Sequence, residues 1–176
     1  MTLILAGPVK VLQKKTKEKE GYDALQVGFI KIEKKKKIKK SMKSKEFRYI
    51  REFPITNSQF PKDTGDEVNV ADFKEGDIVT IIGTSKGKGF QGAVKRHGFH
   101  GRNRTHGMKH DARTTGSIGQ RFPQHTIKGR RMPGRMGSDR VTVKNLKIAK
   151  IDVQNNMIAV KGAVPGHRGS LLQIMG

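Results

Sequence analysis

The stretch IVTIIGTSKGKGFQG, residues 78–92, decides the fold, because a buried strand gives way within it to a segment that cannot be buried. Residues 78–82 are almost all β-branched and apolar, which is typical of a strand covered on both faces. From Gly83 onward, glycine and lysine replace the apolar residues. This change of composition predicts that the chain leaves a β core at about residue 83.

A second set of apolar residues marks the point at which the chain returns. The run Val141–Val153 is followed by Asn155-Asn156 and then by Met157–Val160. Asparagine tolerates positive φ, so this pattern predicts a β-hairpin with a two-residue tip. Buried strands therefore flank residues 83–140, which we call the arm.

The composition of the arm is unsuited to a core. It holds 12 of the 21 glycines, 14 Lys or Arg, five of the six histidines and two carboxylates, a net charge of +12. No periodic apolar face runs through it, so it buries too little surface to offset its own ordering entropy. We therefore expect the arm to take its shape from a polyanion that surrounds it.

The N-terminal part of the chain has two further apolar runs. Leu3–Leu12, around a Gly7-Pro8 turn, and Ala24–Ile32 predict two strands. The mixed-charge segment Lys14–Glu20 lies between them and predicts a turn or hairpin tip.

A lysine-rich loop, residues 31–51, follows these strands with a net charge of +9. Six of the seven residues from Lys34 to Lys40 are lysines. Like charges at this spacing repel one another, so neither a helix nor a strand gains from them. Two interpretations stay open, a solvated flexible loop and a loop that orders on phosphates.

The whole chain carries 37 Lys or Arg against 15 Asp or Glu, a formal charge of +22 over 176 residues, and has no cysteine. This charge argues against a generic soluble enzyme and favours a polyanionic partner. The lack of cysteine excludes disulfides, thiol nucleophiles and Cys-ligated metals. No segment has the ~20 apolar residues of a membrane span or the form of a signal peptide. We expect a soluble, cytoplasmic protein without a membrane partner.

Two motifs in the arm have the residue spacing of a nucleotide-binding site and of a zinc site. Gly87, Gly89 and Gly92 have the spacing of a dinucleotide fingerprint, but no helix pattern or suitably placed carboxylate follows. His106 and His110 have a zinc-binding spacing, yet no helix is indicated and basic residues surround them. No general base stands beside a serine nucleophile. We expect no enzymatic activity, no cofactor and no metal, with nucleotide binding, zinc binding and plain surface histidines as weaker alternatives.

The arm instead has the composition of an RNA-binding segment. Its arginines recur with glycine and phenylalanine between them, and guanidinium planes and aromatic rings both bind phosphates and stack on bases. No helix-turn-helix or aromatic sheet motif is present, so we expect shape-fitted contact with folded RNA rather than readout of duplex DNA. A free RNA chaperone or a peripheral polybasic protein is the alternative.

Several motifs, in order, resemble one family. They are Gly21–Gly28, the string from Phe73 through Gly83–Gly92 to Lys95-Arg96, Thr105–Gly107, Gly116–Gln120, Lys128–Gly134, Met136-Gly137 and Lys161–Gly166. Together they closely resemble the universal large-subunit ribosomal protein number three, in its bacterial form. The likeness covers most of the chain.

The resemblance implies a mainly β fold, a small β-barrel globular domain with a long irregular basic extension inserted between barrel strands. Residues 1–82, with the loop 31–51, would form the first part of the barrel, residues 83–140 the arm that penetrates rRNA, and residues 141–176 the returning hairpin. The family is a structural constituent of the large ribosomal subunit that binds 23S-type rRNA and assists early assembly. Its partners would be rRNA and neighbouring large-subunit proteins, and we expect no homo-oligomer.

The candidate rRNA-binding residues are the basic side chains of the loop and the arm, namely Lys34, Lys35, Lys36, Lys37, Lys86, Lys88, Lys95, Arg96, Arg102, Arg104, His106, Lys109, His110, Arg113, Arg121, Lys128, Arg130, Arg131, Arg135 and Arg140. The resemblance also implies that the tip of the arm lies near the peptidyl transferase centre. The tip residues are Gln120, Arg121, Phe122, Pro123, Gln124 and His125.

The chain departs from the family pattern at three places. Met1 aligns with the family's second strand, so we expect its usual opening segment to be missing. Thr80 stands where the family has Asp or Asn. Phe122 occupies the place of a glutamine that some bacterial members methylate, so that modification is not expected here.

Overall fold

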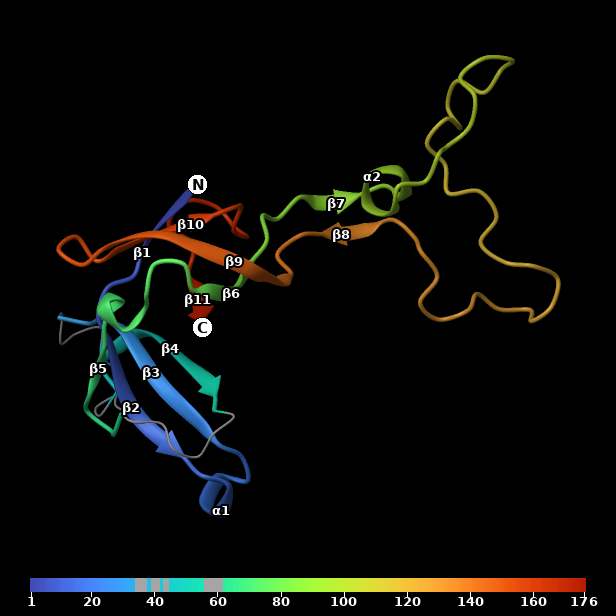
Figure 1. The fold of residues 1–176 in the computed structure, drawn as a ribbon. Coiled ribbons are helices and arrows are strands. Elements are labelled where there is room, and N and C mark those ends of the chain that lie inside the picture. The colour runs from blue at the N-terminus through green and yellow to red at the C-terminus, as the bar shows by residue number, and fades with distance from the viewer. Residues whose placement is uncertain (34–37, 39–41, 43–44, 56–61) are drawn as a thin grey trace. The chain divides into compact units, whose positions relative to one another are not determined.

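A computed structural model describes residues 1–33, 38, 42, 45–55 and 62–176 (Figure 1). The predicted RNA-binding residues Lys34–Lys37, and the two interpretations of the lysine run, lie outside the described residues. The chain forms two compact units. The first comprises Met1–Thr80, Asn145–Ala163 and Gly176, and the second comprises Ile81–Lys144 and Val164–Met175.

The larger sheet has five strands in the order β1-β10-β9-β6-β11. The strands are β1 (Thr2–Leu5), β6 (Ile78–Thr84), β9 (Arg140–Asp152), β10 (Met157–Lys161) and β11 (Leu172–Met175). β6 and β9 are neighbours in this sheet, and the arm is the chain that connects them. The predictions of a mainly β fold and of an extension inserted between strands are confirmed.

Strands β1, β10 and β9 contribute apolar side chains to one buried layer. Ile4 pairs with Ile158, and Val160 pairs with Ile148 after a bulge in the β9–β10 ladder. All four side chains are buried, and Ile158 and Val160 are fully inaccessible. Residues two apart on a strand share a face, so these cross-strand pairs form one continuous apolar layer.

The predicted β9–β10 hairpin is confirmed, but its tip is longer than expected. Asp152 pairs with Met157, which leaves four residues in the turn rather than two. Asn156 has the positive φ (51°) anticipated for an asparagine, while Asn155 instead donates from its backbone N–H and its Nδ2 to the Asp152 carboxylate. The side chain of Asp152 therefore closes the turn from within, as an Asx motif does.

The smaller sheet has the order β4-β3-β2-β5. Its strands are β2 (Val9–Lys15), β3 (Ala24–Lys31), β4 (Phe47–Pro54) and β5 (Glu67–Val68), with the one-turn helix α1 (Lys17–Glu20) at the β2–β3 tip. Its core consists of Val11, Leu25 and Val27, covered by Val9, Phe53, Ile55 and Val68.

The single strand expected over Leu3–Leu12 is in fact two strands in different sheets. β1 pairs with β10, whereas β2 pairs with β3 and β5. The break falls at Gly7-Pro8, because proline lacks the N–H that would continue the ladder. The turn foreseen there is therefore the point at which the chain changes sheet.

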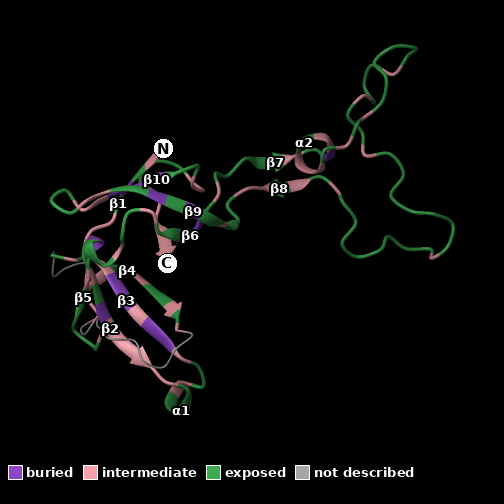
Figure 2. Cartoon of the chain, in the orientation of Figure 1, coloured by how far each residue is buried: buried purple, intermediate pink, exposed green. Residues whose placement is uncertain are grey.

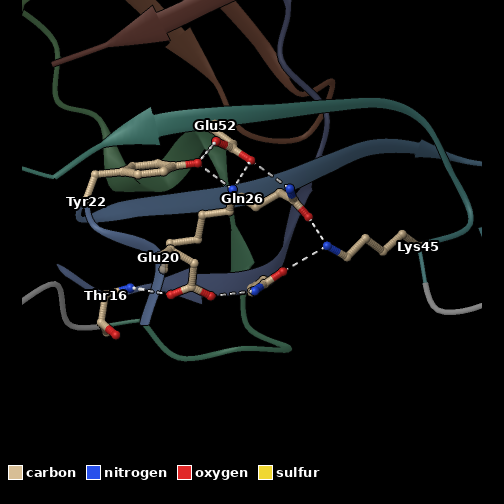
Figure 3. Close-up of polar contacts among 8 residues, drawn as sticks. Thr16, Glu20, Tyr22, Gln26, Lys45 and Glu52 are labelled. Carbon is tan, nitrogen blue, oxygen red and sulfur yellow. Dashed lines mark hydrogen bonds and ion pairs between the residues drawn. The ribbon is translucent and has the colours of Figure 1, made fainter. Parts of the chain in front are cut away.

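Polar side chains cross the smaller sheet as one hydrogen-bonded network (Figure 3). Glu52 on β4 accepts from Tyr22 Oη at 2.8 Å and from Gln26 Nε2 at 2.9 Å, and its carboxylate lies 2.7 Å from Lys15 Nζ. Lys45 donates to Gln13 and Gln26. Hydrogen bonds from Lys15, Tyr22 and Gln26 stabilise the ionised carboxylate and lower the pKa of Glu52 to about 2. In turn, hydrogen bonds with Glu52 and Tyr22 raise the pKa of Lys15.

We predict that Glu52→Gln destabilises the fold at neutral pH and does so less as the pH falls. The pKa of Glu52 is lower in the folded chain than its ordinary 4.5, so its contribution is present above about pH 4.5 and is lost as the pH falls towards 2. Urea denaturation of the full chain at pH 7, 4 and 2.5 measures the difference from wild type. Glu18→Gln, an exposed carboxylate on α1, is the control. A difference that stays constant with pH would contradict the prediction.

Candidate nucleic-acid interface

The two ends of the arm are held together by backbone pairing that we call the neck, residues 85–91 and 134–139. Ser85 N–H donates to Asp139 O at 2.9 Å, and Ser138 N–H donates to Ser85 O at 3.2 Å. Asp139 N–H also donates to the Ser85 hydroxyl at 3.2 Å. Beyond this point β7 (Gly89–Gln91) pairs with β8 (Gly134–Met136), with Phe90 opposite Arg135.

Glycine allows the two sides of the neck to approach closely. A Cβ on Gly137, whose φ is +81°, would lie 2.2 Å from Lys86 O and 2.9 Å from Gly87 Cα. Such a distance is far inside van der Waals contact, so any larger residue must push the strands apart. Gly137 therefore serves the geometry of the neck.

A short helix, α2 (Ala93–His97), extends the neck. Ala93 is buried, and Gly98 ends the helix in the left-handed conformation. Arg96 Nη1 donates to Met132 O at 2.8 Å, and His97 Nε2 lies 3.1 Å from the same oxygen. Arg96, a predicted RNA ligand, thus also anchors α2 to the returning chain.

The distal part, residues 99–133, contains neither helix nor strand. One local closure is the bond from Arg102 N–H to Ala112 O at 3.0 Å. Another joins Arg130 Nη2 to Ser117 O at 3.2 Å. An open cavity of about 450 Å³ is lined by Arg102, Asn103, Thr105, His106 and Met108, and Arg102 and His106 are predicted RNA-binding residues.

Most residues of the arm are exposed to solvent (Figure 2). Only Gly83 and Ala93 are buried among residues 83–140. Of the predicted ligands in the arm, Arg96 is half-buried and all the others are exposed. Among the tip residues Pro123 is half-buried and the rest are exposed, and the Phe90 and Phe122 rings are 77% and 81% accessible.

The charges of the arm lack internal compensation. In the described part of the chain the two ion pairs are Lys15–Glu52 and Lys62–Asp72, both outside the arm. The 14 cations of the arm therefore have no carboxylate within 4 Å among these residues. Exposed, unneutralised guanidinium and ammonium groups beside exposed aromatic rings can bind phosphates and stack on bases.

Metal and membrane chemistry find no support in residues 1–33, 38, 42, 45–55 and 62–176. No group of three or more His, Asp or Glu that could hold a metal ion occurs among them. No helix in this part of the chain is long and apolar enough to cross a membrane.

Comparison with known proteins identifies the family. The model of the ribosomal protein L3 family matches residues 26–155. The large ribosomal subunit protein uL3 of Fervidobacterium nodosum is 46% identical over 99% of this chain and 86% of its own length. The uL3 proteins of Desulfitobacterium hafniense (45%, over 98% of this chain and 83% of theirs) and Thermosipho africanus (46%, 99% and 86%) are similarly close. The chain belongs to the ribosomal protein L3 family.

The resemblance seen in the sequence motifs is thereby confirmed. Members of the L3 family are structural proteins and not enzymes. The expectation that no helix follows the glycine motif was wrong, because α2 begins directly after Gly92, although it has only five residues. The glycine spacing at residues 87–92 falls instead on the neck and the start of α2.

Sequence reasoning missed the residues that build the neck of this L3 protein. Ser85 and Asp139 are 54 residues apart, and nothing local to either position indicates that they pair. Nothing in the sequence indicates that Arg96 and His97 both contact Met132 O. The one available signal was the pair Gly87 and Gly137, since glycines on both sides of an insertion are consistent with close backbone approach.

We predict that Gly137→Ala opens the neck, whereas Gly129→Ala does not. Both glycines have a φ of +81°, but a Cβ at Gly129 has nothing within 4 Å. Both variants therefore carry the left-handed strain of about 1–2 kcal/mol, and only Gly137→Ala adds the clash with Lys86 O. Hydrogen exchange at Lys88 N–H, which donates to Met136 O at 2.9 Å, reports neck opening. Equal exchange in the two variants would contradict the clash argument.

We also predict that trypsin cleaves the free full-length chain first within residues 99–133. This part has exposed Lys and Arg and few backbone hydrogen bonds, whereas Lys147 and Lys150 are also exposed but lie in β9. Local opening, rather than exposure alone, governs cleavage. Mass spectrometry of early fragments measures the order of cleavage. An arm that resists trypsin as long as β9 does, without RNA, would refute this expectation.

Proposed function

We propose that this L3-family chain is a structural constituent of the large ribosomal subunit, in the cytoplasm, where its arm binds 23S-type rRNA. The observation that carries the proposal is the arm itself, a 58-residue insertion with two buried residues and 14 cations that have no carboxylate partner among the described residues. Such a segment needs external counter-charge to be stable in one shape. Folded rRNA supplies it from all sides.

The shape of the arm favours RNA tertiary structure over a duplex groove. The distal part is irregular, and its local closures involve short loops rather than a recognition helix. Proteins that read duplex DNA insert a regular element into the major groove, whereas irregular basic segments fit the varied surfaces of folded RNA. We therefore assign phosphate and base contacts to the exposed basic residues of the arm named above, from Lys86 to Arg140, and to Lys34–Lys37.

The tip, Gln120–His125, is proposed to lie near the peptidyl transferase centre, and the chain to support early subunit assembly beside neighbouring large-subunit proteins. The family likeness suggests this position. The exposure of Phe122 and Arg121 is compatible with it, since both can stack on unpaired bases. We propose a role in structural support for the tip.

The proposal is tested by charge reversal in the arm against a matched reversal outside it. Arg102→Glu with Arg104→Glu changes two exposed arm residues, and the closure at Arg102 uses only its backbone. Lys150→Glu with Lys161→Glu makes the same change in charge on β9 and β10. The measurement is binding of the full chain to large-subunit rRNA over a range of salt concentrations.

We expect the arm variant to bind more weakly and the control to bind as wild type does. Each lost phosphate contact should reduce the magnitude of the negative slope of log K against log salt by about 0.7–0.9. Incorporation into large subunits in a high-salt sucrose gradient should fail for the arm variant alone. Wild-type chain that washes off the subunits at high salt would favour a free RNA chaperone instead. Equal loss in both variants would remove the special role of the arm.

A further inference from the structure

A cavity lies at the base of the arm. Its volume is about 480 Å³, and its lining includes Ser85, Lys86, Lys88, Met136, Asp139 and Val164. All these residues belong to the second compact unit, Ile81–Lys144 with Val164–Met175. Pockets of roughly 300–1,000 Å³ hold drug-sized ligands, and a nucleotide is of that size.

The walls of this cavity are held in place before any ligand arrives. The bonds between Ser85 and Asp139 fix one wall. Gly166, also in the lining, has a φ of +105°, and a Cβ there would lie 2.4 Å from Ser170 Oγ and 3.0 Å from Thr84 O. Close packing therefore holds this part of the lining in place as well. A preformed site binds its ligand without the cost of ordering the protein around it.

The lining combines three kinds of group. Lys86 and Lys88 are exposed cations at the rim, and Met136 and Val164 are half-buried apolar side chains. Asp139 supplies a carboxylate, one of only two in the arm. No cation among the described residues lies within 4 Å of that carboxylate, although its backbone is fully engaged in the neck. A phosphate alone would be repelled by Asp139, so the pocket suits a ligand with donors as well as negative charge.

An RNA nucleotide has this combination, and the carboxylate discriminates among the bases. Two carboxylate oxygens accept best from two adjacent donors. The Watson–Crick edge of guanine presents N1–H and N2–H₂ side by side, whereas adenine and cytosine place an acceptor beside their amino group. Uracil flanks its one N–H with two carbonyl oxygens, which a carboxylate repels.

We propose that the neck cavity binds one unpaired guanine of RNA, with the Asp139 carboxylate accepting from the guanine N1–H and N2–H₂ groups. Lys86 and Lys88 neutralise the adjoining phosphates, and Met136 and Val164 contact the face of the base. This inference rests on the proposed RNA-binding function and adds a base preference to it. Asp139 is then a specificity determinant at the point where the arm leaves the β core.

The test uses the full chain and uridine nonaribonucleotides with a central guanosine, inosine or uridine, under one salt condition. Asp139→Asn removes the double acceptor while its backbone bonds remain. Asp111→Asn is the matched control, because Asp111 is the other exposed carboxylate of the arm and does not line the cavity. Fluorescence anisotropy gives the affinities, and binding to large-subunit rRNA is measured in parallel.

We expect wild type and Asp111→Asn to prefer the central guanosine over uridine by about five- to hundredfold, with inosine, which lacks the N2 amino group, between them. Asp139→Asn should lose the preference and keep its affinity for the uridine oligomer. Equal binding of guanosine and uridine by wild type, or a preference that survives in Asp139→Asn, would overturn the pocket assignment. In either case continued binding to rRNA leaves the proposed function intact, whereas failure to bind rRNA and every oligomer removes both.

Discussion

Ser85 and Asp139 are 54 residues apart in the chain and are joined by two hydrogen bonds, one between backbone groups and one from the Asp139 N–H to the Ser85 hydroxyl. This closure is the constraint on which the arm depends. Closing a flexible loop of that length costs about 3.5 kcal/mol from its length alone. The three bonds among residues 85, 138 and 139 and the bond from Lys88 to Met136, at about 1 kcal/mol each, offset a cost of that size. The β7–β8 ladder and the bond from Arg96 to Met132 add further contacts across the neck, so its stability rests on several contacts rather than on one.

Beyond the neck the chain changes the source of its stability. In the β sheets buried pairs such as Ile4–Ile158 and Val160–Ile148 supply the hydrophobic contribution. In the distal arm Ala112 is half-buried, and its carbonyl oxygen accepts a hydrogen bond from the Arg102 N–H. One polypeptide thus contains a part that folds by burying its own surface and a part suited to burial in a partner. The neck is the boundary between these two parts of the chain.

The sequence predicted those features that rest on local pattern. The alternation at Val141–Val153 and the asparagines after it indicated the β9–β10 hairpin, and the abrupt loss of apolar residues at Gly83 marked the start of the arm. The change of sheet at Gly7-Pro8 was missed, because pattern alone does not say with which partner a strand pairs. The neck was missed for the same reason over a longer range. The exposure of the predicted RNA-binding residues followed from composition. The hydrogen bond from Arg96 to Met132 O is evident only in the three-dimensional structure.

The pairing of β1 with β10 has a consequence for synthesis. Thr2 lies opposite Val160, so β1 pairs with a strand that emerges from the ribosome more than 150 residues later. The sheet of β2, β3, β4 and β5 is complete once Val68 has emerged. Contacts of short sequence separation form first and distant ones last. The nascent chain therefore carries one finished sheet and an unpaired β1, Thr2–Leu5, throughout translation of the arm, and only the β9–β10 hairpin gives that strand its neighbour.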